Sequence, residues 1–121
     1  MAPRVILHVL DWWATVDGSP IRCVRGEVEM LALLLRRPGR VITREVAMDA
    51  IASLDSGEAF DRAIDNRVKL VRRRLRAAGL TDAVLTAYAV GYQWNRDVPA
   101  LLIETEAQAD AWAAAGGVAS C

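Results

Sequence analysis

Residues 58–78 constrain the fold more than any other part of the chain. Within them, apolar residues recur at spacings of 4, 3 and 4 positions: Ile64, Val68, Val71 and Leu75. This spacing places the four side chains on one side of an α-helix. Gly79 follows, in a position typical of a helix end. The sequence therefore predicts a long helix that needs a core on one side and leaves its other sides in water.

The same helix carries a concentration of positive charge. The whole chain is formally neutral, with 15 basic and 15 acidic residues, yet residues 58–76 hold seven cations against three acids. The cations are Arg62, Arg67, Lys69, Arg72, Arg73, Arg74 and Arg76. Charge gathered on one helix indicates nucleic-acid binding. On composition alone, a merely solvated helix face explains these arginines equally well.

Shorter elements surround this helix. Hydrophobic patterning and turn residues predict strands at 5–10, 12–15 and 21–24, helices at 27–37 and 44–53, and a hairpin of 84–88 and 92–94. Thr43 is the expected N-cap of the second helix. A β-sheet, three helices and a two-stranded wing make an α+β winged helix-turn-helix fold, in which the third helix enters the major groove.

At 121 residues the chain fits one domain. We expect a winged-helix domain at 1–98, with the N-terminal sheet at 1–25, the helical core at 26–80 and the wing at 83–95. Residues 99–121 form a tail, helical at 104–115. This tail either packs back on the domain or presents an apolar face to a second copy.

Three segments carry a resemblance to a known family. They are RRPGRVITRE (36–45), RAIDNRVKLVRRRL (62–75) and VLTAYAVGYQW (84–94). Together, in this order, they resemble the C-terminal DNA-binding domain of OmpR/PhoB-type response regulators. The resemblance covers residues 5–94 and implies double-stranded DNA as the partner and transcription regulation as the function.

The resemblance also implies roles for individual residues. It places Arg62, Arg67, Lys69 and Arg72 against phosphates or bases and Thr86 against DNA. It makes Asp65 structural and has Gly91 permit the turn geometry of the wing. From the residues themselves we add four DNA-binding candidates: Arg44 at a helix N-terminus, Asn66 as a reader of adenine, Arg73, and Tyr88 in the wing.

Other functions find little support in the sequence. One histidine, two distant cysteines and no glycine-rich phosphate loop argue against an enzyme, a metal site or a cofactor. Cys23 and Cys121 are expected to be reduced thiols. No apolar run approaches the ~20 residues that span a bilayer, so we expect a cytosolic protein without a membrane partner.

Several partners remain open. The first predicted strand begins close to Met1, which predicts a stand-alone domain without a receiver domain. A homodimer on tandem half-sites is expected on DNA, with RNA polymerase or another regulator as a further partner. However, the 52–59 loop lacks the family's tryptophan, which counts against polymerase contact. The alternative function is a winged-helix protein-interaction module that docks on such a protein without binding DNA.

Overall fold

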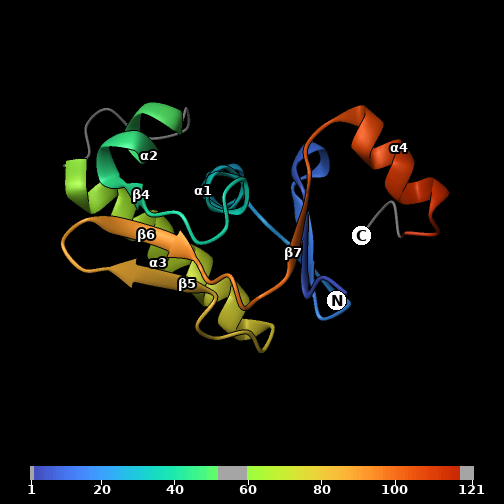
Figure 1. The fold of residues 1–121 in the computed structure, drawn as a ribbon, viewed down its shortest axis with the longest axis horizontal. Helices are drawn as coiled ribbons and strands as arrows, with labels where there is room; N and C mark the ends of the chain where they lie inside the picture. Colours follow the sequence, from blue (N-terminus) through green and yellow to red (C-terminus); the bar gives the residue numbers. More distant parts are fainter. Residues whose placement is uncertain (1, 52–59, 118–121) are drawn as a thin grey trace.

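The computed structural model describes residues 2–51 and 60–117 and confirms the α+β winged-helix fold (Figure 1). In chain order the elements are β1 (Val5–His8), the short 3₁₀ helix η1 (Val9–Asp11), β2 (Trp13–Val16), β3 (Ser19–Arg22), α1 (Arg25–Leu35), β4 (Ile42–Thr43), α2 (Arg44–Ala50), α3 (Phe60–Ala77), β5 (Val84–Ala87), β6 (Gly91–Trp94), β7 (Ala100–Ile103) and α4 (Glu106–Ala114). The expected turn within the 52–59 loop, the first residues of the third helix and Cys121 lie outside the described residues.

The N-terminal sheet is larger than the sequence predicted. Its strand order is β3-β2-β1-β7. β1, β2 and β3 form an antiparallel meander. The turn between β2 and β3 consists of Asp17 and Gly18, whose φ angles are 50° and 85°. Such a two-residue turn suits the twist of a hairpin. It therefore leaves Ser19 paired with Val16 and starts β3 earlier than expected.

β7 lies in the segment that we expected as a tail after the domain at 1–98. Residues 100–103 pair in parallel with β1, with Val5 opposite Ala100 and His8 opposite Ile103. The tail thus begins as a strand of the N-terminal sheet. An uninterrupted apolar run such as ALLI lacks the alternation that marks a half-exposed strand, and it does not distinguish a strand from a helix.

The two faces of this sheet meet different helices. One face belongs to the main core with α1 and contributes Val5, Leu7, Ala14 and Val16. The opposite face carries His8, Trp13 and Ile103, which share a row across the strands and are also buried. There the His8 ring stacks on Trp13 at 4.0 Å between centroids and meets the edge of Trp112, from α4, at 6.2 Å. α4 therefore contacts the sheet face that α1 leaves open at the ring of Trp112, although no residue of α4 is buried.

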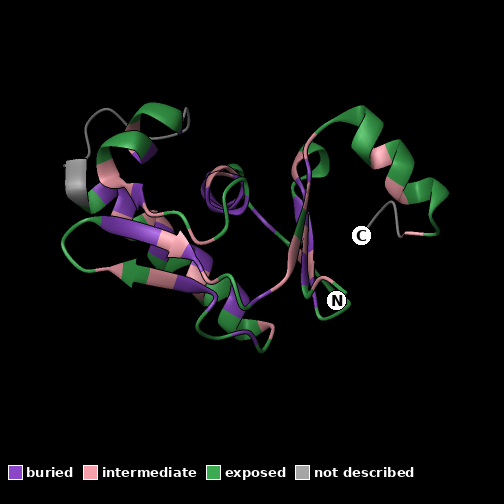
Figure 2. Ribbon diagram, in the orientation of Figure 1, coloured by how far each residue is buried: buried purple, intermediate pink, exposed green. Residues whose placement is uncertain are grey.

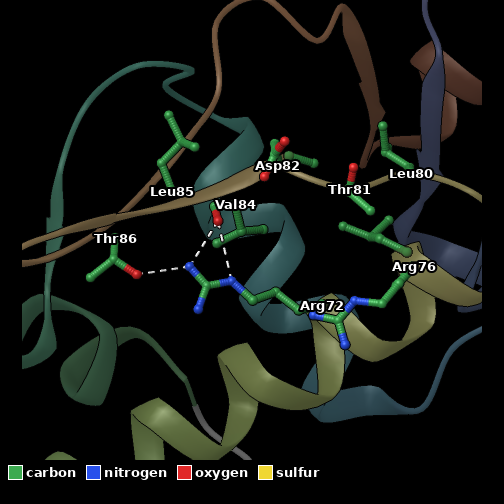
Figure 3. A pocket seen from close by; sticks show the side chains of 10 residues that line it. Arg72, Arg76, Leu80, Thr81, Asp82, Val84, Leu85 and Thr86 are labelled. Carbon is green, nitrogen blue, oxygen red and sulfur yellow. Dashed lines mark hydrogen bonds between the residues drawn. The ribbon is translucent and has the colours of Figure 1, made fainter.

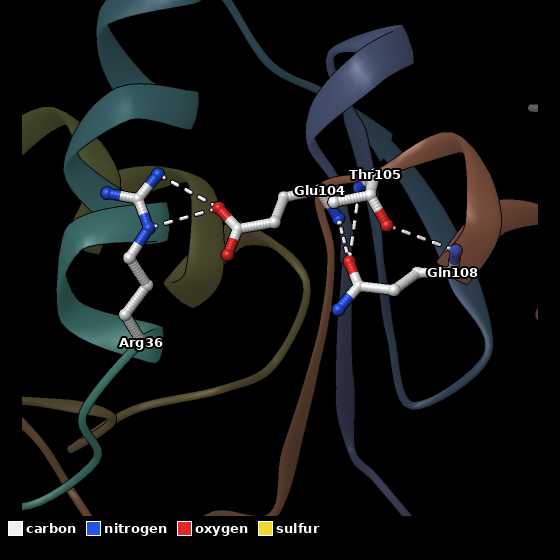
Figure 4. A network of polar contacts seen from close by, with 4 residues as sticks. All are labelled: Arg36, Glu104, Thr105 and Gln108. Carbon is white, nitrogen blue, oxygen red and sulfur yellow. Dashed lines mark hydrogen bonds and ion pairs between the residues drawn. The ribbon is translucent and has the colours of Figure 1, made fainter.

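A polar network joins α4 to the helical core (Figure 4). Arg36, directly after α1, donates to the Glu104 carboxylate at 2.9 and 3.0 Å. Gln108 accepts through its side-chain oxygen from the backbone N–H groups of Glu104 and Thr105. In return the Thr105 hydroxyl accepts from the Gln108 N–H. This capping box fixes the start of α4 at Glu106, two residues later than the expected helix at 104–115.

α1 lies between the N-terminal sheet and the rest of the domain (Figures 1 and 2). It begins two residues earlier than predicted. Val24 offers no side-chain cap, but its N–H donates to Glu27 Oε1 at 2.9 Å. Because the cap is supplied from inside the helix, no N-cap residue in the sequence marks this start. The buried residues of α1 include Leu31 and Leu34, which join the core formed with α3.

The wing is a three-stranded sheet of order β4-β6-β5. The two-residue strand β4 was not predicted; it places Thr43 opposite Gly91. We expected Gly91 to supply the turn geometry of the wing, but the structure shows that it does not. Positive φ falls on Ala89, at 61°, and not on Gly91. A Cβ at Gly91 would instead lie 2.0 Å from the carbonyl oxygen of Ile42, so the glycine permits the close approach of β4.

No helix within residues 2–51 and 60–117 has the length and apolarity needed to cross a membrane. Over the same residues there is no group of three or more His, Cys, Asp or Glu side chains that could hold a metal ion.

Candidate nucleic-acid interface

α3 presents four distinct sides, and each meets a different environment. The core side consists of Ile64, Val68, Val71 and Leu75, all nearly inaccessible to solvent. This confirms the predicted apolar stripe. The remaining sides decide which of the cations on α3 can contact a ligand.

The side opposite the core is polar and exposed. Arg62, Asn66, Lys69 and Arg73 recur at spacings of 4, 3 and 4, and all four are exposed. We call these four residues the exposed stripe. All of them were predicted as DNA-binding residues. The stripe consists of three cations and one amide and includes no acidic residue.

Two residues beside the exposed stripe were not among the individual DNA-binding candidates of the sequence analysis. Arg76 follows Arg73 by three positions and is exposed, so it continues the same helical row. Leu70 is 37% exposed and lies among these cations. Their positions in the helical repeat were the available signal. With Asn66, Lys69 and Arg73, Leu70 lines a hollow of about 460 Å³ on this surface.

The side of α3 toward the wing holds Asp65 and Arg72, which we call the wing flank. Arg72 donates from Nε and Nη2 to the carbonyl oxygen of Val84, at 3.2 and 2.8 Å, and from Nη2 to the Thr86 hydroxyl at 2.8 Å (Figure 3). Arg72 was predicted to contact DNA, but its guanidinium binds β5. Its contact with DNA stays a prediction, and its described bonds give it a structural role.

Asp65 is the centre of a second set of contacts on the wing flank. Its carboxylate accepts from Arg44 Nε at 3.0 Å and from the Tyr92 hydroxyl. Arg44 and Arg72 also lie near the Tyr92 ring, at 5.4 and 5.5 Å from its centroid, within the range of cation–π attraction. The structural role that the family resemblance implied for Asp65 agrees with these contacts.

Burial and charge in this cluster shift two pKa values. Desolvation raises the pKa of Tyr92, and the hydrogen bond to the Asp65 carboxylate raises it further. The same carboxylate raises the pKa of Arg44 through its hydrogen bond. The Arg44 side chain is only 21% exposed. The predicted phosphate contact of Arg44 therefore competes with an internal ion pair, and that contact also stays a prediction.

The side of α3 toward α1 holds Arg67 and Arg74, which we call the α1 flank. Arg74 Nε binds both oxygens of Glu27, at 3.0 and 3.1 Å. Glu27 is 3% exposed. Arg67 lies against the first turn of α1, where a Cβ on Gly26 would sit 1.3 Å from Nη1 of Arg67. The Arg67 guanidinium thus lies against α1 at Gly26, and its predicted contact with DNA stays a prediction.

The wing tip extends away from these contacts. Thr86 is exposed on β5 while its hydroxyl accepts from Arg72. Tyr88, at the start of the connection to β6, is 92% exposed. Figure 1 places this tip at the opposite end of the long axis from α4. The acids of α4, Glu106 and Asp110, are therefore remote from the wing tip.

Comparison with known proteins decides the family. The family model described as "Transcriptional regulatory protein, C terminal" matches residues 18–94, which is more than half of the chain. The chain belongs to this family. It is a family of DNA-binding domains of transcription regulators and not of enzymes, and the family assignment confirms the OmpR/PhoB-type resemblance.

The similar curated proteins are bacterial transcriptional regulators. The chain is 35% identical over 68 residues to the transcriptional regulatory protein CreB of Escherichia coli (strain K12), covering 56% of this chain and 28% of CreB. It is 31% identical over 85 residues to BaeR of Escherichia coli O6:H1, covering 69% of this chain and 35% of BaeR. The chain thus matches about a third of the length of these relatives.

Solved structures agree on the fold. The DNA-binding domain of the response regulator AdeR, solved in complex with an intercistronic region, superposes with a TM-score of 0.68 at 16% identity, covering 78% of this chain and 97% of that domain. The C-terminal domain of the nisin resistance regulator NsrR gives 0.63 at 18% identity, covering 78% and 95%. Both cover nearly all of their own domain but leave about a fifth of this chain unmatched.

Proposed function

We propose that this chain binds double-stranded DNA sequence-specifically and thereby regulates transcription, with the exposed stripe of α3 in the major groove and the wing tip beside it. The observation that carries the proposal is the exposed stripe itself. It places three cations and an asparagine on the one side of α3 that no other described element covers. Cations at such positions neutralise phosphates and release counterions, and arginine and asparagine can also bond base edges.

The arrangement of acids supports DNA over the protein-interaction alternative. A positive face interrupted by Asp61, Asp65 and the acids of the tail would favour a module that docks on another protein; the side chain of Asp61 lies outside the described part of the structure. Asp65 instead turns toward Arg44 and Tyr92. Glu104 pairs with Arg36, on the side of the molecule toward the N-terminal sheet (Figure 4).

A salt series tests this proposal. Affinity for random-sequence duplex DNA is measured from low to moderate salt for the wild type and for a Lys69→Ala/Arg73→Ala variant. We expect the logarithm of affinity to fall with the logarithm of salt concentration. In the double variant the slope becomes shallower by about 1.8 if both side chains contact phosphates, since each contact contributes about 0.9.

The matched control removes two arginines elsewhere. Arg22→Ala/Arg37→Ala makes the same change in charge at two exposed residues outside α3 and the wing hairpin, and it should keep the wild-type slope. Thermal unfolding of both variants checks that neither has lost stability. Absence of binding by the wild type at low salt would contradict the proposal and favour the interaction module.

We extend the proposal to assembly on DNA and to the place of action. Two copies bind tandem half-sites, because one α3 spans only a few base pairs and a single module has a small interface. They act in the cytoplasm, where a bacterial regulator meets the chromosome. Duplexes with one or two copies of a selected half-site, compared by gel shift and ultracentrifugation, test the assembly. Equal affinity for both duplexes would contradict it.

A further inference from the structure

We propose that Leu70 contacts the methyl group of a thymine next to an adenine that Asn66 reads, so that this pair selects an A·T-containing step. The inference rests on the proposed function and assigns a specificity role to a residue that the charge argument leaves out. It starts from the presence of an exposed leucine in a surface otherwise made of cations and an amide.

Leu70 does not belong to the core of the domain. The core row of α3 is complete without it, because Val68, Val71 and Leu75 already belong to the buried core cluster. Leu70 lies between the exposed stripe and the α1 flank and lines the hollow together with Asn66, Lys69 and Arg73. Its methyl groups are therefore open to whatever the exposed stripe contacts.

The spacing of Asn66 and Leu70 suits neighbouring base pairs. Residues four apart on a helix lie on the same side and about 6 Å apart along the axis. Consecutive bases of a strand are about 3.4 Å apart along the duplex axis. A helix lying in the major groove can therefore bring the two side chains to adjacent base pairs, or to pairs separated by one.

The chemistry of the two side chains matches two different edges in the groove. The amide of Asn66 can accept from N6 and donate to N7 of adenine. Leu70 has no polar atom and can gain only by covering apolar surface. In the major groove the C5 methyl of thymine is the apolar group that a side chain reaches. A basic or polar residue at position 70 would lack this preference.

The test removes only that methyl group. Binding sites are first selected from a random duplex library with the wild-type protein, and each thymine of the selected site is then replaced singly by deoxyuridine. We expect one replacement to lower the affinity about four-fold, the effect of removing one buried methyl group. In the Leu70→Ala variant the same replacement should change the affinity less than two-fold.

Two further variants complete the experiment. Leu101→Ala truncates a leucine of the same exposure, 36%, on β7, and should keep the wild-type preference for thymine. Asn66→Ala should lose the preference for adenine at the neighbouring position while the thymine effect persists. If DNA is bound but no thymine shows the effect, or Leu70→Ala retains it, this inference is wrong and the proposed function stands. Absence of any DNA binding would contradict both this inference and the proposed function.

Discussion

Arg72 and Arg73 are adjacent in the sequence and chemically identical, yet they belong to different regions of α3. Arg72 belongs to the wing flank and binds a backbone carbonyl and a hydroxyl of β5, whereas Arg73 belongs to the exposed stripe. A turn of 100° per residue is enough to separate the two roles. A cluster of arginines on a helix can therefore combine side chains with two different roles. Some fix the helix to its domain, and others are available to a ligand.

This contrast predicts that flank residues determine stability and stripe residues determine affinity for DNA. The largest expected effect comes from Glu27, which is buried and serves both Arg74 and the Val24 N–H. Glu27→Ala should lower the free energy of unfolding by about 3 kcal/mol, because it leaves a cation and an N–H group without their partner. Urea unfolding measures the loss.

A double-mutant cycle sharpens this prediction. Arg74→Ala alone, and combined with Glu27→Ala, should show a coupling energy well above experimental error. Additive effects of the two substitutions would contradict the assigned contact. Glu29→Ala is the control, since it removes an acid from the same helix and leaves the Glu27–Arg74 pair intact.

The second prediction compares the two neighbours directly. Arg72→Ala should cost about 2 kcal/mol of stability, because the Val84 carbonyl and the Thr86 hydroxyl lose their donor. Arg73→Ala should leave stability within about 0.5 kcal/mol and instead make the salt dependence of DNA binding shallower by about 0.9. Measuring both quantities on both variants tests the contrast, and a reversed pattern would overturn it.

The third prediction concerns the Tyr92–Asp65 hydrogen bond. Near neutral pH, Tyr92→Phe should lower stability by about 1.5 kcal/mol, since a donor to a charged acceptor is lost. The pKa of Tyr92 is raised in the folded state. The folded protein therefore holds the proton more tightly than the unfolded chain, whose tyrosine pKa is about 10.

The pH dependence follows from that sign. The stabilisation is complete below the unfolded pKa and is lost as pH rises through the folded one. The advantage of the wild type over Tyr92→Phe should thus be constant from pH 7 to 9 and shrink above pH 10. Tyr88→Phe alters the exposed tyrosine and should match the wild type in stability throughout. An advantage that grows with pH would contradict the assignment.

The smallest expected effect comes from moving one cation from a flank toward the stripe. In Gly26→Ala the new methyl group would occupy the place of the Arg67 guanidinium. A flexible side chain can yield, so we expect a change in stability below about 1 kcal/mol. Arg67 would then be displaced toward solvent, and the salt dependence of DNA binding should steepen. An unchanged slope would show that Arg67 already contacts DNA in the wild type or that it moves elsewhere.

Part of the contrast between flank and stripe residues of α3 could be predicted from the helical repeat. Once Ile64, Val68, Val71 and Leu75 define the core side, the same repeat places Arg62, Asn66, Lys69 and Arg73 opposite. What the repeat cannot give is which flank meets α1 and which meets the wing. That depends on how three helices pack, and so the internal contacts of Arg67 and Arg72 could not be predicted from their spacing.

The fold was predictable in the same uneven way. Helices and hairpins can be predicted from local periodicity and turn residues, and the predicted ends of these elements differ from the observed ends by a few residues. β4 and β7 depend on partners far along the chain. β4 has only two residues, and Ala100–Ile103 is an apolar run without alternation although Leu101 is 36% exposed, so its pattern does not distinguish a strand from a helix. Gly91 was recognised as necessary, although a close backbone contact is the reason.

The pairing of β7 with β1 has a consequence for the order of assembly during translation. β1 is synthesised well before its second neighbour, the strand at 100–103, so one edge of β1 stays open until that strand has been made. Helices α1 to α3 and the β5-β6 hairpin can form in the meantime, because these elements all precede residue 100. Completion of the N-terminal sheet therefore waits for its last strand. A nascent chain stalled before residue 100 would display an unpaired strand edge that invites pairing with another nascent chain.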